Sequence, residues 1–213
     1  MKIIIGGPPQ SGKSTFTASL IKSIRERQRE QPYQLSFSWQ PLDVTDNSIA
    51  KLLNPDEDID QKRDVEWSKE RAEERRAVFE ARDEQLVVAD APGLITDELE
   101  IVTEPADKII ILASHEKVDK IEEWKEFAES NDMIVFAELT SILEEDLDPG
   151  WDERGEREGI IRSIEREDFE ENQRTAFDDT SRRMIRQVAT DLLKECSQKG
   201  FGEKDSDERN KGD

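Results

Sequence analysis

Short apolar runs alternate along the chain with longer segments in which apolar residues recur every three or four positions. The short runs are rich in β-branched residues, which is typical of buried strands. Five of them predict strands, at residues 3–5, 35–39, 85–89, 108–113 and 133–139. A further short run at residues 159–164 is a candidate for one more strand. The chain is therefore expected to build a sheet whose strands are buried on both faces.

The longer periodic segments predict amphipathic helices. They lie at residues 13–30, 61–84, 116–130 and 172–196. Strands alternating with helices predict a three-layer α/β/α fold with a mainly parallel sheet of about five strands. Right-handed crossovers would then bring the carboxyl ends of all strands to one edge of the sheet, where ligands bind in such folds.

The length of 213 residues suits one α/β domain. We expect this domain to span residues 1–197. The last stretch, GFGEKDSDERNKGD, is polar and contains several glycines. It predicts a disordered acidic tail over residues 198–213.

The segment that joins the first strand to the first helix carries the most specific motif. Residues 7–14, GPPQSGKS, fit the P-loop pattern G-x-x-x-x-G-K-[ST] at every position. Such a loop turns backbone N–H groups toward a polyphosphate, and the first helical turn adds the positive end of its dipole. We expect Lys13 to lie against the β- and γ-phosphates and the Ser14 hydroxyl to bind Mg²⁺. The predicted nucleotide-binding residues are Gly7, Pro8, Pro9, Gln10, Ser11, Gly12, Lys13, Ser14 and Thr15.

A second motif follows the third predicted strand, at residues 90–93, DAPG. An acidic residue at the carboxyl tip of an apolar strand is the usual partner of a P-loop, so Asp90 is expected to hold Mg²⁺ together with Ser14. Gly93 could bring its N–H close to the γ-phosphate, as in D-x-x-G motifs. Lys13 and Asp90 are thus the candidate catalytic residues. The alternative for Asp90 is an Asx turn that only ends the strand.

The excess of acidic residues indicates what kind of surface the protein has. The chain carries 52 acidic and 31 basic residues, for a net charge of −21. Because the acids are spread along the chain and the apolar patterns are clear, we interpret them as a solvated surface and expect a halophilic source. The same charge argues against non-specific nucleic-acid binding, which needs a basic surface.

Targeting and redox signals are few. The single cysteine, Cys196, excludes an intrachain disulfide and a cysteine-rich zinc site. No apolar run approaches the length of about 18 residues that a membrane span needs, and no secretory signal precedes the P-loop. We therefore expect a cytoplasmic protein without membrane contact.

Two further features leave alternatives open. Residues 116–119, EKVD, resemble the guanine-reading N-K-x-D, but glutamate replaces asparagine and the motif follows the fourth strand. We discount it, which favours ATP over GTP. Four arginines of the charge-dense segment could instead bind a phosphate acceptor, or could merely pair with neighbouring glutamates; they are Arg71, Arg75, Arg76 and Arg82.

The motifs also support a resemblance to known families. The loop GPPQSGKST at residues 7–15 resembles that of small-molecule kinases and AAA-type ATPases, and Pro8 stands where partitioning ATPases carry an extra lysine. The segments at 90–93, 123–128, 137–143 and 159–166 resemble the P-loop module found with a ring nuclease of type III CRISPR systems. This resemblance implies nucleotide binding at residues 7–15 with Asp90 on the metal side. The chain lacks the nuclease domain, so nuclease activity is not implied.

These observations predict an ATP·Mg²⁺-binding P-loop NTPase, and the resemblance suggests a slow regulatory ATPase linked to CRISPR-type defence signalling. The alternative is a small-molecule or nucleotide kinase whose acceptor is held by residues 40–84. The sequence leaves the choice between hydrolase and phosphotransferase open. It also leaves open whether the chain acts with a protein partner or as a homo-oligomer.

Overall fold

The computed structural model describes residues 1–30, 35–45, 47–54, 56–60, 66–143, 147–153, 157–163 and 177–202. Within them the strands are β1 (Lys2–Gly6), β2 (Phe37–Pro41), β3 (Leu86–Asp90), β4 (Lys108–Ser114), β5 (Ile134–Ile142), β6 (Gly150–Trp151) and β7 (Glu158–Arg162). The α-helices are α1 (Lys13–Glu30), α2 (Ser48–Leu53), α3 (Lys69–Glu80), α4 (Asp97–Thr103), α5 (Ile121–Ser130) and α7 (Asp179–Gly202). A 3-10 helix, η1 (His115–Lys120), leads from β4 into α5.

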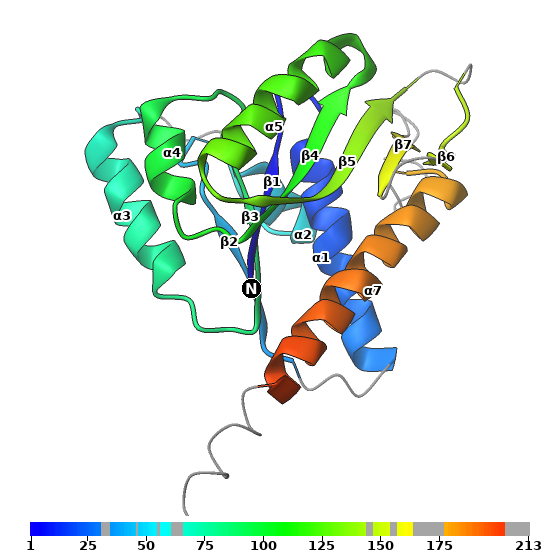
Figure 1. Cartoon of the computed structure of the whole chain (residues 1–213), viewed down its shortest axis with the longest axis horizontal. Helices are drawn as coiled ribbons and strands as arrows, with labels where there is room; N and C mark the ends of the chain where they lie inside the picture. Colours follow the sequence, from blue (N-terminus) through cyan, green and yellow to red (C-terminus); the bar gives the residue numbers. More distant parts are fainter. Residues whose placement is uncertain are drawn as a thin grey trace, which may run out of the picture.

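The strands form one sheet in the order β2-β3-β1-β4-β5-β7-β6. All neighbouring strands run parallel except β6, which is antiparallel to β7. Helices cover both faces, so the predicted three-layer α/β/α fold is confirmed (Figure 1). The sheet has seven strands rather than about five. The additional strands extend one edge, where β6 is only two residues long and has no periodicity that a sequence could show.

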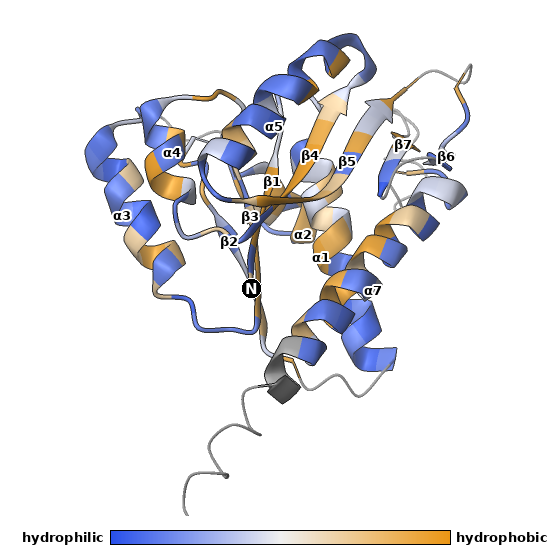
Figure 2. Ribbon diagram, viewed as in Figure 1, coloured by the Kyte–Doolittle hydropathy of each residue, from blue (hydrophilic) through white to orange (hydrophobic). Residues whose placement is uncertain are grey.

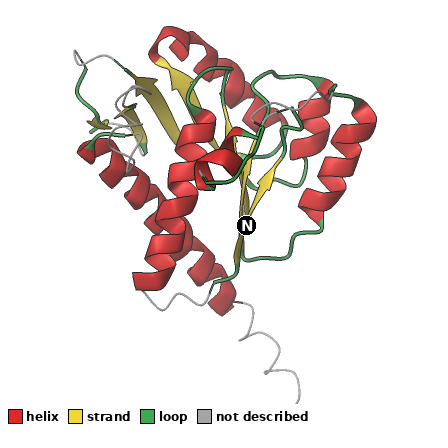
Figure 3. Cartoon of the chain, turned by 180° about the vertical axis from the view of Figure 1, so that it is seen from behind, coloured by secondary structure: helices red, strands yellow, loops and turns green. Residues whose placement is uncertain are grey.

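Alternation along each strand divides the core into two layers. In β1, Ile3 and Ile5 pack with α1 and α7, whereas Ile4 packs with α3, α4 and α5. Figure 1 from the front and Figure 3 from behind show helices on both sides of the sheet. Figure 2 shows orange along β4 and blue on the outer sides of α3 and α5, as expected for a sheet buried between amphipathic helices. The central position of β1 places the loop that follows it in the middle of the sheet edge.

Several predicted helix boundaries were wrong, and capping explains them. Helix α3 begins at Lys69 rather than 61, because Ser68 is its N-cap and accepts a hydrogen bond from the Arg71 amide. Helix α7 begins at Asp179 rather than 172, since the Asp178 carboxylate accepts from the Ser181 amide. Residues 61–65 and 172–176 lie outside the described part of the chain.

Helix α7 also continues to Gly202, past the predicted end at 196. The predicted tail beyond Gly202 lies outside the described residues, and the domain limits of 1–197 stay a prediction. None of the helices in the described ranges combines the length and the apolar character needed to cross a bilayer.

The short helices α2 and α4 were not predicted. Thr96 caps α4 by accepting from the Leu99 amide at 3.3 Å, and acidic residues fill its first turn. Both are helix-start signals that the sequence offers. The helix itself has only seven residues, which is too short for a periodic pattern to stand out.

Candidate functional site

The candidate site is the loop between β1 and α1, at the carboxyl edge of the sheet. Gly7 begins it with φ +138°, and a Cβ added there would lie 1.9 Å from the backbone oxygen of Leu112 in β4. Only glycine can therefore let the chain leave β1 this close to β4. Gly12, with φ +76°, ends the loop, and the amide of Phe16 donates to its carbonyl as α1 begins.

Lys13 lies inside this loop. Its ammonium donates to the carbonyl oxygens of Gly7 and Pro8, each at 2.8 Å. Ser14 and Thr15 follow it in the first turn of α1, and no acidic residue is present in that turn. The N-terminal N–H groups and the helix dipole therefore meet no neighbouring carboxylate in the first turn that would neutralise them.

The loop has a buried floor and an exposed tip. Gly7 and Ser11 are buried, whereas Pro9, Gln10 and Gly12 are exposed. Gln10 adopts φ +60°, which is uncommon for a residue with a Cβ. An incoming ligand would thus reach the loop from its exposed tip.

Asp90 lies beside the start of the loop. In the parallel pairing of β1 with β3 it stands opposite Ile5, whose carbonyl accepts from the Ala91 amide at 3.0 Å. Its exposed fraction is 6%. Asp90 thus places a carboxylate, a type of group that can bind Mg²⁺, next to the loop. Asp43, after β2, instead forms an Asx turn, in which its carboxylate accepts from the amide and the hydroxyl of Thr45.

Gly93 brings the exit of β3 against the loop. A Cβ added to Gly93 would lie 2.9 Å from the Pro9 nitrogen and 3.0 Å from Nζ of Lys13. A larger residue would have to displace the loop or the lysine. The D-x-x-G segment and the P-loop, which are far apart in sequence, are therefore in direct contact.

Two residues that the sequence analysis did not assign also hold the loop. Lys117 of η1 donates to the Pro9 carbonyl at 2.6 Å, and the Ser141 hydroxyl at the end of β5 donates to the Ser11 carbonyl at 3.1 Å. Lys117 belongs to the EKVD segment, which we had weighed only as a base-reading motif. Nothing in the sequence marks Ser141, because its role depends on the position of β5 two strands away from β1.

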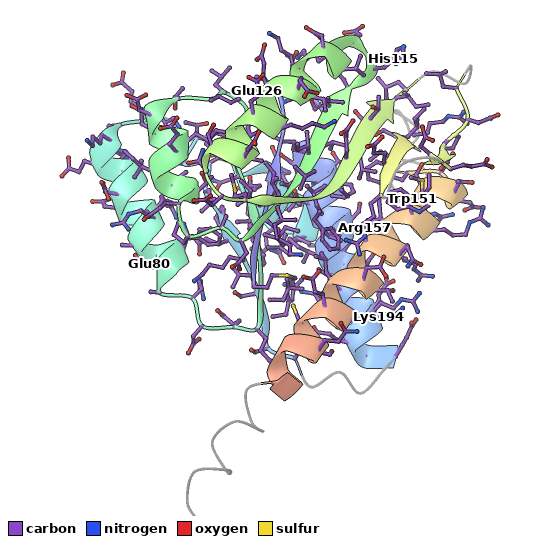
Figure 4. The ribbon with its side chains drawn as sticks, in the orientation of Figure 1. Glu80, His115, Glu126, Trp151, Arg157 and Lys194 are labelled. Carbon is purple, nitrogen blue, oxygen red and sulfur yellow. The ribbon has the colours of Figure 1, made fainter. Side chains whose placement is uncertain are left out.

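The candidate acceptor arginines are not all near this site. Arg76 donates hydrogen bonds to the carboxylates of Glu73, Glu80 and Glu104 at 2.8–3.3 Å, and those to Glu73 and Glu104 raise the pKa of its guanidinium. This network lies at the opposite edge of the sheet, where Lys2 donates to the Glu80 carbonyl. Figure 4 shows Glu80 far from His115, which follows β4 at the loop edge.

Other basic residues have structural partners. Arg82 donates to Glu84 and Gln40. Arg162 of β7 donates to the Leu147 carbonyl, and its guanidinium lies 3.8 Å from the Asp178 carboxylate. These two arginines therefore join neighbouring segments of the fold rather than lining the loop.

Comparison with known proteins agrees with this architecture. No protein-family model and no curated sequence matches the chain. Among solved structures, it is similar to the septum site-determining protein MinD complexed with Mg-ADP from Pyrococcus horikoshii OT3, with 12% identity and a TM-score of 0.60 over 93% of this chain and 99% of that one. It is also similar to MinD in the MinC:MinD cell division protein complex from Aquifex aeolicus, with 12% identity, a TM-score of 0.61 and coverage of 91% and 96%.

A third similar structure is a nucleotide-binding protein in complex with ADP from Archaeoglobus fulgidus, with 15% identity, a TM-score of 0.51 and coverage of 88% and 86%. At such low identity the likeness concerns the fold alone. The chain thus has the fold of these proteins, which confirms the predicted architecture. The roles of the individual residues depend on the site itself.

Proposed function

We propose that the loop between β1 and α1 binds the phosphates of ATP together with Mg²⁺. The observation that carries this proposal is the enclosure of Lys13 by two glycines. Gly7 lets the start of the loop pack against β4. A Cβ added to Gly93 would lie 3.0 Å from Nζ of Lys13, so the segment after β3 lies close to the lysine. Both close approaches pack the loop tightly around Lys13.

The residues present fit this ligand. The loop offers backbone N–H groups at the N-terminus of α1, and the Lys13 ammonium donates to the Gly7 and Pro8 carbonyl oxygens, which phosphate oxygens can replace. Ser14, the residue after Lys13, supplies a hydroxyl, and Asp90 supplies a carboxylate beside the loop. We propose Ser14 and Asp90 as the residues that hold the metal.

Bound Mg²⁺ would supply electrostatic stabilisation of the charge that develops on the phosphates. Lys13 and the loop amides would add to this stabilisation from fixed positions, so that little reorganisation is needed during the reaction. Gly93 lets the segment after β3 pack against Pro9 and Lys13 without displacing either residue.

The similar structures support the ligand class. The Pyrococcus protein was crystallised with Mg-ADP and the Archaeoglobus protein with ADP. The Aquifex protein is in complex with MinC, so a protein partner is a reasonable proposal for this chain too. We retain the slow regulatory ATPase as the proposed activity. Its link to CRISPR-type defence depends only on the sequence resemblance, and neither the fold nor the comparisons support it.

The test is the affinity for ATP, measured by titration calorimetry with and without MgCl₂. Lys13→Ala should weaken binding at least about tenfold, because a charge-assisted contact to phosphate is lost. Lys22→Ala is the matched control, since Lys22 is an exposed lysine of the same helix. Asp90→Asn should reduce the gain in affinity that Mg²⁺ provides.

Turnover then separates the two activities. Phosphate release from ATP alone supports the hydrolase, whereas ATP use that rises only with a small-molecule or nucleotide acceptor supports the kinase alternative. If the unaltered chain binds no nucleoside triphosphate, or if Lys13→Ala binds ATP as tightly as the unaltered chain, the proposed function is wrong.

A further inference from the structure

The 3-10 helix η1 contributes a second lysine to the loop. Lys117 adopts non-helical backbone angles, φ −126° and ψ 22°, which interrupt η1 in its middle. Its ammonium donates to the Pro9 carbonyl at 2.6 Å, across a separation of 108 residues. This bond joins the exit of β4 to the exposed tip of the loop.

The tip needs such support. Pro8 and Pro9 have no N–H to donate, so this part of the loop cannot be held by its own amide hydrogen bonds. Gln10, the next residue, has φ +60°, a conformation that costs free energy unless its surroundings fix it. Pro9 is held from the other side by the close approach of Gly93. Lys117, from the segment after β4, and Gly93, from the segment after β3, thus both contact Pro9.

The neighbouring lysine has a different role. Lys120, also in η1, donates to Glu123 at 2.6 Å within the start of α5. That hydrogen bond raises the pKa of Lys120 and stabilises the helix start. Within η1, Lys120 therefore forms a local ion pair, whereas Lys117 bonds to the loop. Lys120 is thus a matched control for experiments on Lys117.

We propose that Lys117 is a positioning residue of the nucleotide site, which holds the tip of the P-loop in its binding conformation through the Pro9 carbonyl and adds a positive charge beside the phosphates. The proposal depends on the proposed nucleotide binding at this loop. A loop whose amides already point toward the phosphates loses less conformational entropy on binding. The charge matters more in a chain with a net charge of −21, which otherwise repels a triphosphate.

The test compares Lys117→Met, Lys117→Arg and Lys120→Met in the full chain. Without nucleotide, hydrogen exchange at the amides of residues 10–12 should be faster in Lys117→Met and unchanged in Lys120→Met. The Kd for ATP should rise about tenfold in Lys117→Met, as expected for loss of one charge-assisted hydrogen bond. Lys117→Arg should stay within about threefold of the unaltered chain, because a guanidinium can also donate to a carbonyl. Melting temperatures should be alike, since the side chain is not part of the core.

Three results would overturn the role of Lys117. One is unchanged amide exchange in Lys117→Met, another is an unchanged Kd, and the third is a loss in Lys117→Arg as large as that in Lys117→Met. Failure of the proposed function is a different result, in which the unaltered chain itself binds no ATP. The exchange measurement needs no nucleotide, so in that case it still decides whether Lys117 holds the loop.

Discussion

Replacing Gly7 with alanine tests the closest contact of the site. The added Cβ would lie 1.9 Å from the Leu112 carbonyl oxygen and 2.8 Å from its carbonyl carbon. Leu112 lies in β4 and is fully buried. The oxygen and the carbon that the added Cβ would meet both belong to its backbone. No side-chain rotation can relieve the overlap, so the end of β1 and the middle of the sheet would have to move apart.

The expected cost has two parts. Overpacking of a well-packed interior costs about 1–3 kcal/mol, and a residue with a Cβ held at an unfavourable positive φ costs about 1–3 kcal/mol more. The sum, about 2–6 kcal/mol, is a large share of the roughly 5–15 kcal/mol by which proteins are stable. In a chain of this size a loss of about 4 kcal/mol lowers the melting temperature by roughly 8–16 °C.

The assay is thermal and urea unfolding followed by circular dichroism. Gly150→Ala is the matched control, because a Cβ added to Gly150 meets no atom within 4 Å. This control should change stability by less than about 0.5 kcal/mol, as is usual for surface substitutions. If Gly7→Ala unfolds at the same temperature as the unaltered chain, or if the two variants lose the same stability, the contact between the loop and β4 is not as described.

Other changes probe the loop, the sheet and the surface. Gly93→Ala should weaken ATP binding at least about tenfold while lowering the melting temperature less than Gly7→Ala does, because a loop yields more easily than a strand; full ATP affinity would contradict the contact with Pro9. Lys108→Met should lower the free energy of unfolding in urea by about 1–2 kcal/mol, because the Lys108 side chain is 9% exposed and its ammonium lies 2.6 Å from the Glu195 carboxylate. The loss is limited because Glu195 is 28% exposed and can regain water. Lys108→Met/Glu195→Met should recover most of that loss, and a double variant no more stable than the single one would refute the reasoning. Raising NaCl from about 0.1 M to about 1 M should raise the urea midpoint by screening the repulsion among the acids, and an unchanged midpoint would count against a surface adapted to salt.

The candidate site could be predicted in part from the chain. The P-loop pattern and the DAPG segment are local, and their residues meet as strand pairing requires, with Asp90 opposite Ile5. The contributions of Lys117 and Ser141 could not be predicted, because each bonds to a loop carbonyl more than a hundred residues away. The sequence leaves two alternatives for Arg76, and the structure favours ion pairing because Glu104, 28 residues away, completes its network.

The sequence by itself determined the fold class and the position of the loop between β1 and α1, because the periodicity of apolar residues and the spacing of glycine and lysine are short-range properties of the chain. The tertiary structure decided the rest. It extended the sheet through the two-residue strand β6, shortened helices where Ser68 and Asp178 cap them, and brought η1 onto the loop tip. These outcomes depend on which distant segments meet, and burial and packing over the whole chain select those contacts.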